Sequence, residues 1–144
     1  IRKWFSNMRG QEPVDINGDG ASSRDFWYIE NCVQANILAA STQNADAVNQ
    51  VYNVAFGQRT TLNELFILIR DRVQAQRPDL EIADPVYREF RPDDVRHSLA
   101  DISKAEDQID YQPVYSVRDG LNEAARWYVE NLVDRPNNSY LTPA

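Results

Sequence analysis

The sequence predicts a mixed α/β protein in which short strands are separated by helices, and three observations favour this class. Thr61 with Glu64, and Ser116 with Asp119, each form the capping pattern that opens a helix, and apolar residues at helical spacing follow both pairs. Val51–Ala55 is a short run that is apolar on both faces, which is typical of a strand covered on each side. The length of 144 residues corresponds to one domain.

The helices are predicted from apolar spacing and from the residues that stop it. Gly10 closes the first helix and Pro78 ends the third. The expected helices span residues 1–9, 29–41, 61–77, 101–107 and 116–132. The apolar face expected for the second helix is made of Ile29, Val33, Ile37 and Ala40. The stripe expected for the third is made of Leu62, Leu65, Phe66, Ile69 and Val73. The stripe expected for the last is made of Val117, Leu121, Ala124, Tyr128 and Leu132.

The strands are predicted from short apolar or aromatic runs that lie between these helices. They span residues 14–16, 25–29, 51–55 and 86–90. We expect a folded segment over residues 1–133 and a flexible tail over residues 134–144. Because the sequence starts at Ile1 instead of methionine, we expect it to be a piece of a longer polypeptide.

Composition excludes several classes of partner. The formal net charge is -7 and the pI is about 4.6, so a nucleic-acid backbone is not an expected ligand. Cys32 is the single cysteine, which rules out an internal disulfide and fits a reducing compartment. No apolar run approaches the roughly 20 residues of a membrane span, and no signal-peptide core is present. We therefore expect a cytoplasmic protein with no membrane partner.

Positive charge gathers in the segment Tyr87–His97, which also holds the single histidine. Its arginines are Arg88, Arg91 and Arg96. Pro92 favours an extended backbone before it, so these arginines lie at the end of a strand and in the loop that follows. Guanidinium groups presented from such a loop suit a phosphate or carboxylate. The alternative is that the arginines pair with the acidic residues of the same segment.

Other patterns predict less. Asp15–Gly20 matches the first half of a calcium-binding loop, but Phe26 stands where a bidentate glutamate is required. A glycine-rich dinucleotide pattern that starts at the same turn fails because Ser23 replaces its third glycine. His97 and Cys32 lack the neighbours that catalysis or metal binding needs, so we interpret both as structural. No metal site is predicted.

Three motifs in order resemble those of a known family. They are residues 17–31 (NGDGASSRDFWYIEN), residues 52–62 (YNVAFGQRTTL) and residues 87–98 (YREFRPDDVRHS), followed by DISKA at residues 101–105. They resemble the extended short-chain dehydrogenases/reductases that act on nucleotide sugars. The residue pattern of the third motif is most like that of the bacterial UDP-N-acetylglucosamine 4-epimerases.

The resemblance implies roles for five residues. Arg24 and Arg91 match the arginines that hold the UDP diphosphate, and Asp94 matches an aspartate that accepts from the ribose hydroxyls. Arg59 matches an arginine near the uridine, and Trp4 matches a pocket tryptophan near the sugar. No catalytic residue is assigned to this chain.

Some features of that family are missing from the sequence. Asp15 stands where relatives place an aromatic residue beside uracil, and Asp93 stands where glycine is common. The glycine-rich NAD turn is absent, and neither Lys3 nor Lys104 completes the Tyr-x-x-x-Lys pair that does the proton work. The chain is therefore similar to the C-terminal, substrate-binding part of the family, without its N-terminal Rossmann half.

The resemblance predicts the activity of the intact protein. It would be an NAD-dependent 4-epimerase of UDP-N-acetylglucosamine and UDP-N-acetylgalactosamine, with NAD bound mainly by the missing half, and a homodimer. Alone, this chain would be inactive. A UDP-glucuronate decarboxylase or a nucleotide-sugar 4,6-dehydratase shares these nucleotide-binding residues and stays an alternative. A non-catalytic binding module is a further alternative.

Overall fold

The computed structural model describes residues 1–132, and the predicted tail lies outside the described residues. Its α-helices are α1 (Arg2–Arg9), α2 (Ile29–Ser41), α3 (Leu62–Gln76), α4 (Ser103–Ile109) and α5 (Val117–Asn131), and η1 (Ala45–Ala47) is a 3-10 helix. Its strands are β1 (Asp15–Asn17), β2 (Ser23–Arg24), β3 (Thr60–Thr61) and β4 (Val86–Arg88). β1 pairs with β4 in parallel, and β2 pairs with β3 antiparallel. The prediction of short strands alternating with helices is confirmed.

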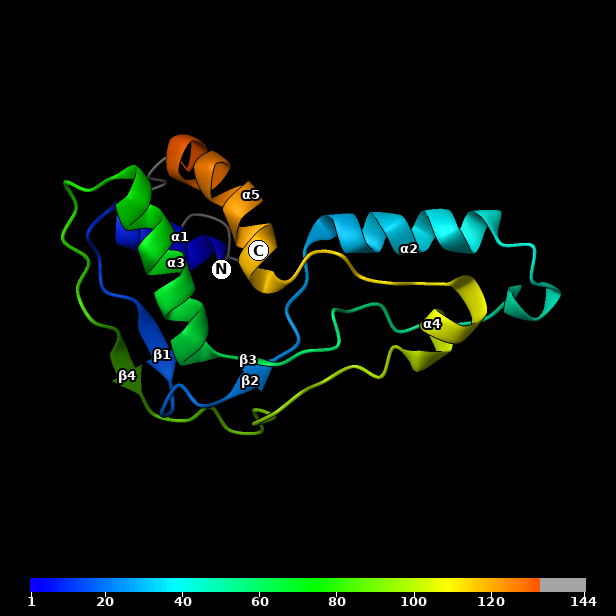
Figure 1. Ribbon diagram of the computed structural model, residues 1–144. Helices are drawn as coiled ribbons and strands as arrows, with labels where there is room; N and C mark the ends of the chain where they lie inside the picture. Colours follow the sequence, from blue (N-terminus) through cyan, green and yellow to red (C-terminus); the bar gives the residue numbers. More distant parts are fainter. Residues whose placement is uncertain (133–144) are drawn as a thin grey trace, which may run out of the picture.

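The fold is elongated and has two hydrophobic cores (Figure 1). In the first, α1, α3 and α5 pack together beside the β1–β4 pair, around Phe5, Ile16 and Ile69. In the second, α2 and α4 lie side by side away from the first core, and Ala35, Ala105 and Tyr111 are buried there. The β2–β3 pair lies between the two, so the segments around it connect both parts of the molecule.

The two predicted capping boxes form and set the starts of α3 and α5. Thr61 Oγ1 accepts from the Glu64 amide at 3.1 Å, and a Glu64 oxygen accepts from the Thr61 amide at 2.8 Å. Ser116 and Asp119 make the same reciprocal pair at 3.2 and 3.1 Å. These hydrogen bonds from Thr61 lower the pKa of Glu64, because they favour the ionised carboxylate. Both helices therefore begin where the sequence predicted.

Two of the predicted strands are wrong. Val51–Ala55 has no regular secondary structure and pairs with no strand among residues 1–132, and Val51 is 84% exposed. A strand needs a neighbour for its backbone hydrogen bonds, and an apolar run alone cannot supply one. Residues 25–29 are also not a strand, because Asp25 turns to accept from the backbone amides of Phe56 (3.2 Å) and Gly57 (3.0 Å). The chain then enters α2 at Ile29.

The predicted apolar face of α2 points to solvent. The helix has the predicted bounds, yet Ile29, Val33 and Ile37 are 57%, 42% and 61% exposed. The residues that it buries are Asn31 and Ala35, on the opposite side. Apolar side chains at this spacing normally cover a core, so this stripe is a surface that the described residues leave uncovered.

Tyr111 anchors the second core through a buried hydroxyl. This hydroxyl donates to the Ala55 carbonyl at 2.8 Å, and the side chain is fully buried. Burial, followed by the nearby Cys32 and Asp25, raises the pKa of Tyr111 to about 12. The folded state therefore favours the neutral phenol, which stabilises the fold fully below pH 10, and this stabilisation is lost as the pH rises toward 12.

We expect Tyr111→Phe to lower the free energy of unfolding by about 1 kcal/mol at pH 7, because one buried hydrogen bond is lost. Urea unfolding between pH 7 and pH 11.5 should then show a shallower alkaline decline in the variant than in the wild type. If the free energy of unfolding declined in parallel in the two proteins, Tyr111 would not contribute to the alkaline loss of stability.

Candidate nucleotide-diphosphate site

Parallel pairing of β1 with β4 brings the predicted arginine segment beside the glycine turn. Asn17 is in register with Arg88, and the Arg88 carbonyl accepts from the Gly18 amide at 2.9 Å. Further on, the Ser23 amide donates to the Arg96 carbonyl at 2.9 Å, and the Ser98 amide donates to the Ser23 carbonyl at 3.1 Å. The loops that leave the carboxyl ends of these two strands therefore run side by side, which is where α/β sheets place ligand groups.

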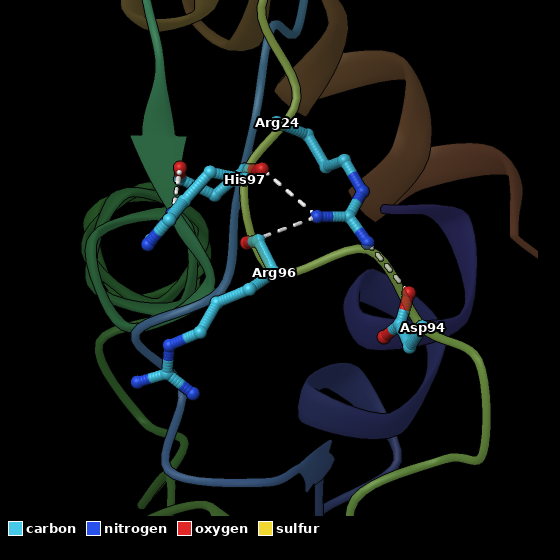
Figure 2. A network of polar contacts seen from close by, with 5 residues as sticks. Arg24, Asp94, Arg96 and His97 are labelled. Carbon is cyan, nitrogen blue, oxygen red and sulfur yellow. Dashed lines mark hydrogen bonds and ion pairs between the residues drawn. The ribbon is translucent and has the colours of Figure 1, made fainter.

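Arg24 and Asp94, which the resemblance assigns to one ligand, contact each other. Arg24 Nη2 donates to Asp94 Oδ1 at 2.6 Å. Arg24 Nη1 donates to the Ser23 carbonyl at 2.9 Å and to the Arg96 carbonyl at 3.3 Å. Figure 2 shows the Arg24 guanidinium held between the Arg96 backbone and the Asp94 carboxylate, while the Arg96 side chain points the other way. Both side chains keep about a third of their surface exposed, so a ligand can reach them.

The three arginines of the segment reach across to the residues of β1 and its turn. Arg88 Nε donates to Asp15 at 2.9 Å, and Arg96 Nη2 donates to Asp19 at 2.6 Å. With the Asn17 amide turned so that its oxygen faces the guanidinium, Arg91 donates to it from Nε at 2.7 Å and from Nη2 at 3.0 Å. The alternative in which these arginines pair with acids of their own segment is therefore wrong for all three.

This arrangement explains why Asp15–Gly20 resembles half of a calcium loop. Asp15, Asn17 and Asp19 alternate along the chain, and each oxygen faces a guanidinium. The Arg96 side chain, with the Ala21 amide, lowers the pKa of Asp19. Across residues 1–132, no group of three or more His, Cys, Asp and Glu side chains is placed to hold a metal ion. The alternating oxygens of Asp15, Asn17 and Asp19 thus accept hydrogen bonds from arginines.

The two departures from the family pattern have structural reasons. Asp15 is the partner of Arg88, so its carboxylate is used in an ion pair. Asp93 adopts a φ of 61°, the left-handed conformation in which glycine carries no steric cost. Asp tolerates this conformation better than most residues, which lets the loop turn between Arg91 and Asp94.

Arg59 and Trp4 lie outside this network. Arg59 is exposed and precedes β3, whose Thr60 is paired with Arg24, so it borders the same edge. Trp4 is half-buried on α1, and its ring meets Phe66 edge to face at 6.3 Å. The structure thus places Trp4 at the α1–α3 contact, and no polar contact described for residues 1–132 links it to Arg24.

His97 and Asp25 hold the loops in place. His97 Nδ1 lies 2.9 Å from Ser23 Oγ, and Figure 2 shows this contact across the two neighbouring segments. Asp25, next to Arg24, ties the turn at Phe56 and Gly57 to β2. Neither Asp25 nor Asn17 was predicted as a site residue. The sequence signal that could have identified Asp25 is its position directly after Arg24.

The Gly18–Gly20 turn does not form a cradle for a dinucleotide. The turn contains two glycines with positive φ, Gly18 and Gly20, but it leads into β2 instead of a helix. A Cβ at Gly18 would meet the Phe90 ring, and one at Gly20 would meet the Asn63 side chain. These glycines thus make room for protein side chains, whereas a nucleotide-binding turn uses them to admit phosphate.

Between residues 1 and 132, no helix is long and apolar enough to cross a membrane.

Comparison with known families adds an independent result. The family model described as GDP-mannose 4,6 dehydratase matches residues 3–124 of this chain. The chain belongs to the GDP-mannose 4,6 dehydratase family. This family lies within the extended short-chain dehydrogenases/reductases, so the resemblance inferred from the motifs is confirmed.

Proteins similar in sequence to this chain include several that are described as nucleotide-sugar epimerases. A protein of Bacillus subtilis strain 168 described as an uncharacterized UDP-glucose epimerase is 33% identical over 123 residues, which is 85% of this chain and 36% of that protein. The UDP-N-acetylglucosamine 4-epimerase of Methanobrevibacter ruminantium M1, solved with UDP-N-acetylmuramic acid, has a TM-score of 0.71 at 37% identity and matches 90% of this chain and 38% of its own.

A third relative was solved with both a sugar nucleotide and a cofactor. The UDP-glucuronic acid 4-epimerase of Bacillus cereus, a Y149F mutant in complex with UDP-4-deoxy-4-fluoro-glucuronic acid and NAD, has a TM-score of 0.75 at 27% identity. The match covers 90% of this chain and 39% of that one. The chain therefore spans less than two fifths of the length of each of these three relatives.

Proposed function

We propose that this chain is the C-terminal, substrate-binding part of an NAD-dependent nucleotide-sugar 4-epimerase, and that it holds the diphosphate of a UDP-sugar. The observation that carries the proposal is that Arg24, Arg91 and Asp94 lie on the neighbouring segments that follow β1 and β4, where Arg24 pairs with Asp94 and Arg91 with Asn17. Membership of the family and the similarity to proteins solved with UDP-sugars support it.

The chemistry of these side chains suits a nucleoside diphosphate. Two guanidinium groups on adjacent loops, from Arg24 and Arg91, supply positive charge and donors for the phosphate oxygens. The Asp94 carboxylate accepts well from ribose hydroxyls while it orients Arg24. Arg59, at the same edge, would reach the uridine side. Trp4 would contribute to the sugar pocket from α1.

The substrate that we propose is UDP-N-acetylglucosamine, interconverted with UDP-N-acetylgalactosamine for polysaccharide biosynthesis. The similarity to the UDP-N-acetylglucosamine 4-epimerase, at 37% identity, favours this sugar. A UDP-glucuronate decarboxylase or a nucleotide-sugar 4,6-dehydratase would use the same clamp, and a dTDP-glucose 4,6-dehydratase of Haemophilus influenzae is 29% identical to this chain.

NAD would be bound mainly by a part of the protein that this chain does not contain. The Gly18–Gly20 turn does not form a dinucleotide cradle, and the exposed stripe of Ile29, Val33 and Ile37 is a surface that such a part could cover. When bound, NAD would accept and return the hydride of the sugar. We further propose that the intact protein is a cytoplasmic homodimer.

This chain alone should not epimerise UDP-N-acetylglucosamine. Its sequence has neither a Tyr-x-x-x-Lys pair nor a glycine-rich NAD turn, and no loop movement can supply them. The assay is incubation with UDP-N-acetylglucosamine and NAD, followed by separation of the galacto epimer, with the complete gene product that carries this chain as the positive control. Turnover by the chain alone would contradict its assignment as a substrate-binding part. Binding of UDP without turnover by the complete gene product would favour a non-catalytic binding module.

A further inference from the structure

The charges that face the arginine segment are not equal along β1 and its turn. Residues 15, 17 and 19 each present a side-chain oxygen to one arginine, and the outer two are aspartates. The middle one is Asn17, which is neutral. Arg88 and Arg96 are therefore each paired with a carboxylate, whereas the partner of Arg91 carries no charge.

This difference decides which arginine can bind an anion most readily. A phosphate that approaches Arg88 or Arg96 must compete with a carboxylate for the same guanidinium, and it meets a negative charge at close range. At Arg91 it meets an amide, so the full charge of the guanidinium is available to the ligand. Arg24 should bind an anion with intermediate ease. It is paired with the Asp94 carboxylate, but two of its three hydrogen bonds go to neutral backbone carbonyls.

The geometry at Asn17 also leaves a binding edge accessible. Both hydrogen bonds from Arg91 come from the Nε–Nη2 edge of the guanidinium. Among residues 1–132, the described contacts include no partner for Nη1, so the Nη1–Nη2 edge can form a two-pronged contact with phosphate oxygens. Asn17 thus fixes the direction of the guanidinium and does not occupy all of it.

We propose that Asn17 is a positioning residue of the diphosphate site, which keeps Arg91 directed toward the ligand without neutralising it. This inference rests on the proposed function, because it assumes that Arg91 meets the diphosphate. It makes the amide at position 17, and not only the arginine, a determinant of affinity for anionic ligands.

The test compares Asn17→Asp with Asn17→Ala in the complete gene product, by calorimetric titration with UDP and with uridine. Asn17→Asp has nearly the same shape and gives Arg91 a carboxylate partner, so affinity for UDP should fall by about tenfold or more. Asn17→Ala removes the positioning but leaves the charge free, and it should lose only a few-fold. Neither change should affect uridine, which has no phosphate.

A matched control separates the local pair from the overall charge. The double variant Asp15→Asn with Asn17→Asp has the same net charge as the wild type, and it should bind UDP as weakly as Asn17→Asp alone. Asp15→Asn alone should not lower the affinity for UDP. Thermal unfolding of each variant checks that it is folded.

The outcomes distinguish the inference from the proposed function. If Arg91→Ala weakens UDP but Asn17→Asp binds like the wild type, the inference is wrong and the proposed function stands. Equal losses in Asn17→Asp and Asn17→Ala would also overturn it, because the charge at position 17 would then have no effect. If Arg91→Ala binds UDP like the wild type, the proposed role of Arg91 fails and the inference fails with it.

Discussion

Replacing Arg91 should weaken UDP binding by about ten- to a hundredfold. A hydrogen bond to a charged group contributes about 1.5–3 kcal/mol, and each 1.4 kcal/mol corresponds to a factor of ten. Arg91→Ala should show the full loss. Arg91→Lys should also lose affinity, because an ammonium offers a point charge and cannot form the planar two-pronged contact. The measurement is calorimetric titration of the complete gene product with UDP, and uridine should bind all three proteins alike.

Arg77 provides a matched control for this experiment. Its side chain is 43% exposed and forms an ion pair with Asp79 at 2.6 Å, away from the two loops of the site. Arg77→Ala and Arg77→Lys should therefore leave UDP affinity unchanged. An ordinary surface contact at Arg91 would make a difference of less than about 1 kcal/mol. If the wild type and both Arg91 variants bound UDP with equal affinity, Arg91 would not be part of the site.

Replacing Asn31 by alanine should destabilise the protein by about 3 kcal/mol. Asn31 on α2 is fully buried, and its amide donates to the Tyr115 carbonyl at 2.7 Å. Its Oδ1 accepts from the backbone amides of Val114 at 3.1 Å and Tyr115 at 3.0 Å. Without the side chain these three backbone groups lose their partners, and each unsatisfied group costs about 1–3 kcal/mol where water cannot replace the bond.

The same substitution on the solvent side of α2 gives the control. Asn36 is exposed, and within residues 1–132 its side chain donates only to Cys32 on its own helix. Asn36→Ala should change the free energy of unfolding by less than about 0.5 kcal/mol. Urea unfolding of both variants checks this, and similar stabilities for Asn31→Ala and Asn36→Ala would show that the Asn31 contacts do not hold α2 in place.

The helices could be predicted from the sequence because their signals are local. The capping boxes at Thr61 and Ser116 depend on residues three apart, and both form as expected. The strand at Val51–Ala55 depends on a neighbour, and none of the described residues supplies it. The spacing of Ile29, Val33 and Ile37 correctly predicted the helix α2, but spacing alone cannot show which face is covered.

The sequence proposed members of the candidate site but did not predict their contacts. Motif resemblance pointed to Arg24, Arg91 and Asp94, and the parallel β1–β4 pairing brings their segments together. The Arg24–Asp94 ion pair and the Arg91–Asn17 contact join residues about 70 positions apart. Such pairings follow from the register of two strands, which composition and local pattern do not determine.

The most direct test of the central claim is a crystal structure of the complete gene product with UDP. The account predicts that the diphosphate lies within hydrogen-bond distance of the Arg24 and Arg91 guanidinium groups, with Asn17 still bonded to Arg91. It also predicts that the ribose hydroxyls contact Asp94. A diphosphate bound elsewhere, with Arg24 paired only to Asp94 and Arg91 only to Asn17, would contradict the assignment of these loops as the nucleotide clamp.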